Sequence, residues 1–127
     1  MAQLRDIVID CSHAASLARF WAAALDGYSV APYDSEEIER LRSLGITDLE
    51  DDPSVLVEGP GPRLFLQRVP EVKRGKNRVH LDLTAVDAED EVDRLVSIGA
   101  SVIGQYESHL TLADPQGNEF CVILRRG

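Results

Sequence analysis

The chain has 127 residues, of which 44% are hydrophobic, and its 13 basic and 22 acidic side chains give a net charge of −9. This length and apolar content predict one globular domain, residues 1–127, with a hydrophobic core. The negative charge opposes binding to nucleic acid or to an anionic membrane, and no apolar run approaches the roughly 18 residues of a membrane span, so we expect neither partner. The N-terminus does not resemble a secretion signal, and Cys11 and Cys121 lack the spacing of a metal site or a disulfide framework, so we expect a cytoplasmic protein with reduced thiols.

The first half of the sequence begins with an apolar run, IVID, that predicts a strand ending at Asp10. Leu17, Phe20 and Trp21 then recur at helical spacing, and Gly27 ends that segment. We interpret Trp21 as a core anchor of this helix, with stacking on a ligand as the alternative. Further short apolar runs predict strands over residues 29–32, 54–58 and 63–69.

An acidic insertion at about residues 33–53 interrupts this half. Ile38, Leu41 and Leu44 recur at helical spacing there and predict an extra short helix over residues 35–44. The stretch 62–79 is basic by contrast. A solvated surface explains both stretches; the alternative is that the following four basic residues border an anionic ligand or meet the acidic stretch of a second subunit: Lys73, Arg74, Lys76 and Arg78.

The second half repeats the pattern of the first. The run VHLD corresponds to IVID, and Asp82 matches Asp10 while Gly99 matches Gly27, both at an offset of 72 residues (82 minus 10 and 99 minus 27). Asp87 is a favourable N-cap for the helix that ends before Gly99. Strands are predicted over residues 101–105, 109–113 and 119–124, and the DPQGN sequence between the last two predicts a type I turn with a left-handed glycine.

Three segments carry a resemblance to a known group of proteins: FWAAAL, LFLQRVPEVKRGKNRVHLDL and DPQGNEFCVI. They resemble the vicinal oxygen chelate superfamily, which contains glyoxalases, bleomycin-resistance proteins and extradiol dioxygenases, and within it the glyoxalase-like proteins of actinobacteria. The resemblance covers nearly the whole chain. It implies an α+β fold of two paired β-α-β-β-β modules, at about residues 1–72 and 73–127, whose cupped mixed sheets surround a central cleft for a small-molecule ligand. It also implies a homodimer.

Metalloenzymes of the superfamily take their ligands from the first and last strand of each module, and the resemblance places Val8, Gln67, His80 and Cys121 at these four positions. Valine has no donor atom, and of the four only His80 keeps the ligand type of the superfamily. We therefore expect that the usual metal site is lost and that no cofactor is bound. An alternative with a divalent metal bound by Gln67, His80 and Glu119 stays open.

Strand alternation places polar side chains on the predicted ligand face, because residues two apart share a face of a strand. His80 and Asp82 form the candidate catalytic pair for acid-base chemistry. The alternatives are that Asp10 and Asp82 fix the strand-to-helix loops, that His80 is a core histidine and that Cys121 is a small hydrophobe. His13 and His109 are expected at the surface. The full set of predicted ligand-binding residues is Asp10, Trp21, Phe65, Gln67, His80, Asp82, Glu119 and Cys121.

Three classes of function follow from these observations. The first is a metal-free protein that binds or sequesters a small organic ligand. The second is a lyase or isomerase acting on a small oxygenated metabolite through His80 and Asp82. The third is an interaction module, in which the acidic insertion and the basic stretch 62–79 form a self-complementary dimer contact.

Overall fold

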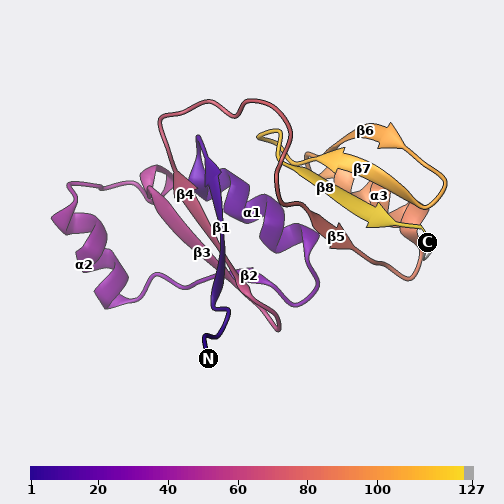
Figure 1. Cartoon of the computed structure of the whole chain (residues 1–127). Helices are drawn as coiled ribbons and strands as arrows, with labels where there is room; N and C mark the ends of the chain where they lie inside the picture. The colour runs from indigo at the N-terminus through magenta and orange to yellow at the C-terminus, as the bar shows by residue number, and fades with distance from the viewer. Residues whose placement is uncertain (125–127) are drawn as a thin grey trace. The chain divides into compact units, whose positions relative to one another are not determined.

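The computed structural model describes residues 1–124. The chain forms two compact units, Met1–Val72 and Lys73–Gly127. Each unit contains, in chain order, a strand, a helix and three further strands that form one four-stranded mixed sheet (Figure 1). This architecture confirms the predicted α+β class with paired β-α-β-β-β modules. Among the helices within residues 1–124, none combines the length and the apolar sequence that crossing a membrane requires.

The sheet of the first unit has the order β1-β4-β3-β2, with β1 parallel to β4 and the other pairs antiparallel. The predicted strands and the inserted helix are present, with ends that differ by at most two residues. The elements are β1 (Asp6–Cys11), α1 (Ala14–Ala24), β2 (Ser29–Val30), α2 (Ser35–Ser43), the 3-10 helix η1 (Leu49–Asp51), β3 (Ser54–Glu58) and β4 (Arg63–Arg68).

The core of the first unit lies between α1 and the sheet. Alternate residues of β3 and β4, among them Val57 and Leu66, are fully buried on the side that α1 covers. Trp21 is only 1% exposed, and its ring meets Phe20 edge-on with 5.2 Å between centroids. Trp21 therefore has the core role that its position on the apolar stripe of α1 predicts.

The acidic insertion is fixed to the first unit by a buried carboxylate. Asp52 is 2% exposed and accepts hydrogen bonds from the Tyr33 hydroxyl at 2.7 Å, from Arg40 Nη2 at 3.0 Å and from the backbone N–H of Ser54 at 3.0 Å. Burial and the neighbouring Asp52 carboxylate together raise the pKa of Tyr33 well above its ordinary value. In Figure 1, α2 stands apart from the sheet, and through Asp52 this network links Arg40 of α2 to the start of β3 at Ser54.

The sheet of the second unit has the order β5-β8-β7-β6, again with the first strand parallel to the last. Asp87 caps α3 as predicted, its side chain accepting from the N–H of Asp90. The predicted strand VHLD is shorter than expected: it starts at Leu81, so His80 precedes the strand and does not belong to it. The elements are β5 (Leu81–Leu83), α3 (Ala88–Ser97), β6 (Ser101–Gln105), β7 (His109–Ala113) and β8 (Glu119–Ile123).

The turn between β7 and β8 confirms the DPQGN prediction. The carboxylate of Asp114 accepts from the N–H groups of Gln116 and Asn118, at 2.9 and 3.0 Å, and Gly117 adopts φ +86°, a conformation that favours glycine. The turn sets the register in which Cys121 lies opposite Thr111. A local sequence motif thus decides which side chains of β8 and β7 lie side by side.

Candidate functional site

A pocket of about 370 Å³ lies on the face of the second sheet that α3 does not cover. The side chains of β8 alternate, so Phe120 and Val122 enter the core while Glu119, Cys121 and Ile123 line the pocket. The lining residues are Lys76, Asn77, His80, Asp82, Tyr106, His109, Thr111, Glu119, Cys121 and Ile123. All of these residues except Ile123 carry a polar or titratable side chain.

Cys121 lies at the centre of the pocket floor. In the sheet it is the register partner of Asp82 on one side and of Thr111 on the other. Cys121 is only 6% exposed, and its Sγ lies 3.5 Å from Thr111 Oγ1. The predicted burial of this cysteine is therefore seen, but within a polar row and not within an aliphatic one.

His80 and Asp82 form a close pair at the edge of the pocket. His80 Nε2 lies 3.1 Å from Asp82 Oδ1, and the two side chains are 51% and 57% exposed. The carboxylate of Asp82 is therefore solvated, and β5, which carries it, is an edge strand of the sheet. His80 is likewise exposed and is not a core histidine.

Glu119 fixes the basic segment before β5 to the sheet. One carboxylate oxygen accepts from the backbone N–H of Asn77 at 3.0 Å, and the other pairs with Lys76 Nζ at 3.2 Å. The Asn77 hydrogen bond and the Lys76 ammonium lower the pKa of Glu119 below its ordinary value. Lys76 therefore borders the pocket, as one alternative for the basic stretch predicts, with its charge partly neutralised by Glu119.

Six residues of this lining were missing from the predicted ligand-binding set: Lys76, Asn77, Tyr106, His109, Thr111 and Ile123. The rings of Tyr106 and His109 stack with centroids 4.8 Å apart, and Ser108 Oγ lies 2.8 Å from His109 Nδ1. His109 is partly exposed at the start of β7 and lines the pocket wall, a role that the prediction of a surface position did not include. Alternation along the predicted strand 109–113, paired through the DPQGN turn, contained the signal that would have identified Thr111 and His109.

The open face of the first unit carries the remaining predicted residues except Trp21. Asp10 is the register partner of Gln67, both are exposed, and Phe65 lies next to Val8. Trp21 is enclosed in the core and offers almost no surface to a ligand, which corrects its place in the predicted ligand-binding set. Within residues 1–124, neither Asp10 nor Asp82 accepts a hydrogen bond from a loop amide, so the predicted loop-fixing role is not seen. A cleft that joins the residues of both modules stays a prediction.

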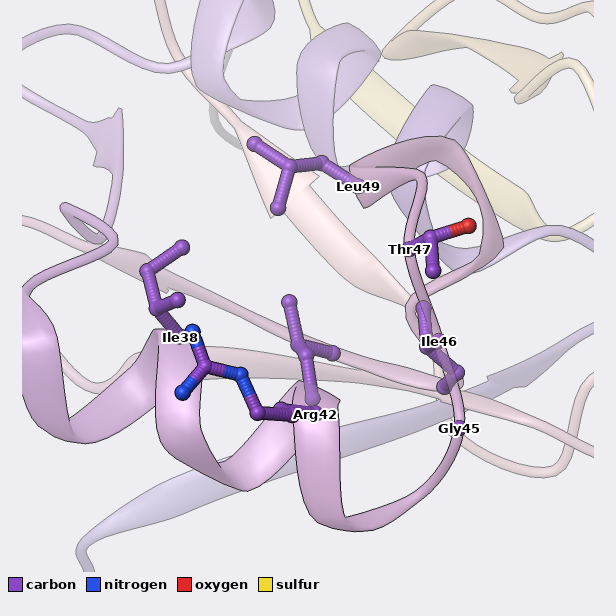
Figure 2. Close-up of a pocket in the computed structure, with 7 residues that line it drawn as sticks. Ile38, Arg42, Gly45, Ile46, Thr47 and Leu49 are labelled. Carbon is purple, nitrogen blue, oxygen red and sulfur yellow. The ribbon is translucent and has the colours of Figure 1, made fainter.

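A second hollow, of about 300 Å³, lies within the acidic insertion of the first unit. Figure 2 shows Ile38 extending from α2 and Leu49 from η1 on opposite sides of it. Its other lining residues are Leu41, Arg42, Gly45, Ile46 and Thr47. Arg42 is the one titratable group in this lining, and its guanidinium pairs with Glu39, so the hollow offers little chemistry.

Donor chemistry decides which metal ions the chain can hold. Val8 offers no donor, Gln67 a weak amide and Cys121 a sulfur, so the superfamily's four positions do not fit a hard ion such as Mg²⁺ or Mn²⁺. A different set is present within the second unit, where ligand atoms of His80, Asp82 and Cys121 all lie within 4.8 Å of one another. Asp82 was not among the metal ligands that the sequence suggested.

Comparisons with known proteins agree with this fold. Residues 6–123 match the sequence pattern of the glyoxalase-like domain family. The fosfomycin resistance protein FosX from Mesorhizobium loti has a similar structure, with a TM-score of 0.69 and 10% identity over 99% of this chain and 94% of that chain. A glyoxalase/bleomycin resistance protein/dioxygenase family enzyme from Burkholderia phytofirmans PsJN gives a TM-score of 0.62 and 15% identity over 95% of this chain and 97% of that chain.

A third similar structure is a glyoxalase-related enzyme from Fulvimarina pelagi, with a TM-score of 0.62 and 15% identity over 97% of this chain and 88% of that chain. No curated protein matches the sequence significantly. Identities of 10–15% establish a shared fold and do not transfer an activity.

Proposed function

Because the chain belongs to the glyoxalase-like domain family, we propose that it binds a small polar organic molecule in the pocket of its second unit. The observation that carries this proposal is the convergence of His80, Asp82, Thr111 and Cys121 on one hollow of about 370 Å³. Pockets that bind small molecules have volumes of roughly 300–1,000 Å³ and present a few convergent polar groups. The volume therefore suits a ligand at the small end of that range.

The lining indicates what kind of molecule fits. The stacked rings of Tyr106 and His109 form a flat wall suited to a ring or a conjugated group. The half-exposed imidazole of His80 and the hydroxyl of Thr111 can bond to ligand oxygens. Asn77 adds a buried Oδ1 that has no hydrogen-bond partner within residues 1–124, and a ligand N–H or O–H would satisfy it. We therefore expect an oxygen-bearing molecule with a flat portion.

The comparisons support a small-molecule role without identifying the molecule. One solved protein of this fold is a fosfomycin resistance protein and another is a glyoxalase-related enzyme. The proposed binding does not use the superfamily's four-position metal site, whose donor set does not fit here. Membership of the actinobacterial subgroup and a cytoplasmic location remain predictions.

Acid-base catalysis is the second candidate function. It rests on the 3.1 Å contact between His80 Nε2 and Asp82 Oδ1, through which the carboxylate can orient the imidazole. In this version His80 transfers a proton to or from a small oxygenated substrate, as a lyase or an isomerase requires. Because the pair is solvated, the bound substrate itself would have to exclude water from it.

A homodimer remains a proposal based on charge. Several acidic groups of the insertion are already paired within the first unit, because Glu37 and Asp52 contact Arg40 and Glu50 contacts Arg19. The charge left for a second subunit is therefore smaller than the sequence suggests. Sedimentation at tens of micromolar chain distinguishes a dimer from a monomer.

A ligand screen tests the binding proposal and separates the two candidate functions. We would screen small aromatic, anionic and cationic compounds at millimolar concentration by NMR, with a chelator present so that no metal contributes. The expected result is a set of binders that shift the signals of Thr111 and His109. Binders recovered unchanged indicate sequestration, whereas conversion that is lost in His80→Ala indicates catalysis.

A matched pair of variants locates the binding. Thr111→Val removes the pocket hydroxyl at constant shape and is expected to weaken binding about tenfold, the effect of one lost hydrogen bond. Val96→Thr makes the reverse exchange on the exposed surface of α3, away from the pocket, and should leave the affinity unchanged. Absence of any binder, or equal effects of the two variants, would overturn the proposal.

A further inference from the structure

The pocket of the second unit brings together three metal-type donors from two separate segments of the chain. His80 supplies an imidazole nitrogen, Asp82 a carboxylate oxygen and Cys121 a sulfur, and these atoms lie within 4.8 Å of one another. Around a tetrahedral zinc ion with bonds of about 2.0–2.3 Å, neighbouring donor atoms lie about 3.3–3.6 Å apart. The limit of 4.8 Å on the separations of these atoms exceeds the tetrahedral distance by little more than about 1 Å. Rotation of the two half-exposed side chains, His80 and Asp82, can close that gap.

We propose that His80, Asp82 and Cys121 form a site for one borderline-soft divalent ion of the Zn²⁺ class, with a fourth position open toward the pocket. Three protein donors and one free position are the arrangement of a zinc site that also binds a small molecule or water. The inference uses the same pocket as the proposed function, but the ion site requires no organic ligand. If both are present, the ion is a cofactor of the proposed binding, and the organic ligand would bind its open position through an oxygen atom.

The sheet holds the donors in place. Cys121 lies between β5 and β7, Asp82 is its register partner, and His80 lies two residues from Asp82 on the same side of the chain. Thr111 Oγ1, at 3.5 Å from the sulfur, can donate a hydrogen bond to a bound thiolate. Such a contact orients a ligand from outside the coordination shell.

The thiolate decides which ion binds. Sulfur and imidazole donors favour Zn²⁺ and Co²⁺, whereas Mg²⁺ and Mn²⁺ prefer all-oxygen sites. The proposed site therefore shares His80 and Cys121 with the superfamily's four positions, but takes Asp82 as its third ligand and uses neither Val8 nor Gln67. All three donors lie within the second unit, so the first unit contributes none.

Binding has a defined proton balance. The cysteine binds as a thiolate, so its S–H proton passes to solvent as the sulfur–metal bond forms. His80 binds through a neutral ring nitrogen, and its 3.1 Å contact with Asp82 is replaced by two bonds to the ion. One net proton is released when the imidazole is already neutral.

Titration of the tag-free full chain with Co²⁺ tests this site directly. The expected result is one Co²⁺ per chain, with a thiolate-to-cobalt charge-transfer band in the near ultraviolet and intense visible bands of tetrahedral cobalt. Stoichiometric Zn²⁺ should abolish these bands, while an excess of Mg²⁺ should leave them. A wild-type protein without the charge-transfer band would overturn the proposal, whatever the variants do.

Four variants assign the ligands. Cys121→Ser is expected to lose the charge-transfer band, and Cys11→Ser, which changes the other buried cysteine, is expected to keep it. His80→Ala and Asp82→Asn should each weaken Co²⁺ binding at least about 100-fold, because even partners outside the coordination shell contribute 10- to 100-fold. Circular dichroism checks that each variant is folded. A band that survives in folded Cys121→Ser contradicts the assignment.

The proposed ion site and the proposed binding of an organic ligand can be overturned independently of each other. A Co²⁺ band in a protein with no organic binder supports the ion site and overturns the proposed function. An organic binder in chelator, together with a wild-type protein that shows no Co²⁺ band, supports the proposed function and overturns the ion site.

Discussion

The two sheets have the same strand pairing, but the side chains on their open faces differ in chemical type. In the first unit one row across the sheet reads Asp10, Gln67 and Ser54, and in the second the corresponding row reads Asp82, Cys121 and Thr111. The strand order and the parallel pairing of first and last strands are the same in both. The repeated strand arrangement therefore gives corresponding positions to the side chains of the two units, and the residue types at these positions determine their chemistry.

The neighbouring row makes the difference clearer. In the first unit Val8, Phe65 and Leu56 lie side by side, an apolar row. In the second unit the corresponding positions near the start of β5 and β8 carry His80 and Glu119. The side chains that we propose for metal binding and proton transfer therefore lie in the second unit.

Carboxylates have opposite roles in the two units. Asp52 of the first unit is buried and holds the insertion through Tyr33 and Arg40. The side chain of Asp82 in the second unit is more than half exposed, and its carboxylate pairs with His80. One carboxylate stabilises the fold, and the other is available to a ligand or an ion.

The largest expected effect comes from removing these two carboxylates in turn. Asp52→Ala leaves the hydroxyl of Tyr33 and the guanidinium of Arg40 without their buried acceptor, so the free energy of unfolding should fall by about 3 kcal/mol. Asp82→Ala should change it by no more than about 0.5 kcal/mol, because the side chain is solvated. Urea unfolding of both variants measures the two values.

Tyr33→Phe is the control for this comparison. It removes one hydrogen bond to Asp52 and should lower the free energy of unfolding by about 1 kcal/mol. Equal losses in Asp52→Ala and Asp82→Ala would show that the contrast between the units is mistaken.

An intermediate effect is expected for Glu119, and it depends on pH. Because the folded-state pKa of Glu119 is lowered by Asn77 and Lys76, its contribution is fully present above the unfolded pKa of about 4.3 and is lost as pH falls through the folded value. Glu119→Gln should therefore lower the thermal midpoint at pH of about 7 and leave it close to wild type once the carboxylate is protonated. Thermal unfolding across that range gives the comparison.

Glu58→Gln provides the matched control for Glu119. Glu58 ends β3 of the first unit and is exposed, so its substitution should have little effect at any pH. A difference between Glu119→Gln and wild type that grows in acid would have the wrong sign for the proposed anchor.

The smallest expected effect concerns the wall of the pocket. A Cβ on Gly104 would lie 2.9 Å from Cε2 of Tyr106, closer than real contacts allow, so Gly104→Ala should displace the ring from His109. Tyr106 is exposed and can move, so the free energy of unfolding should fall by about 1 kcal/mol or less. The loss of the ring-current shift on His109 in NMR spectra reports the displacement.

Tyr106→Ala should abolish the same ring-current shift on His109 and serves as the reference. If His109 keeps its wild-type shift in Gly104→Ala, the glycine is not what allows the stacked wall.

The sequence by itself determined the elements and their order. The apolar alternation of residues 54–58 and 109–113, the cap at Asp87 and the turn around Gly117 are set within a few residues of chain, so local patterns predict them. The repeated spacing of Asp10 and Asp82 also placed both at equivalent ends of the first strands. For the site, alternation identified the face that carries His80, Asp82 and Cys121.

Only the tertiary structure decided which of these residues meet and how exposed they are. Asp82 lies beside Cys121 because the distant strands β5 and β8 pair in one register, and the ring of Tyr106 stacks on His109 and lies close to Gly104. Trp21 is in the core because α1 presents it to the sheet, although its residue type equally suits a ligand wall. Such outcomes depend on register, side-chain torsions and burial summed over distant residues, which no local pattern encodes.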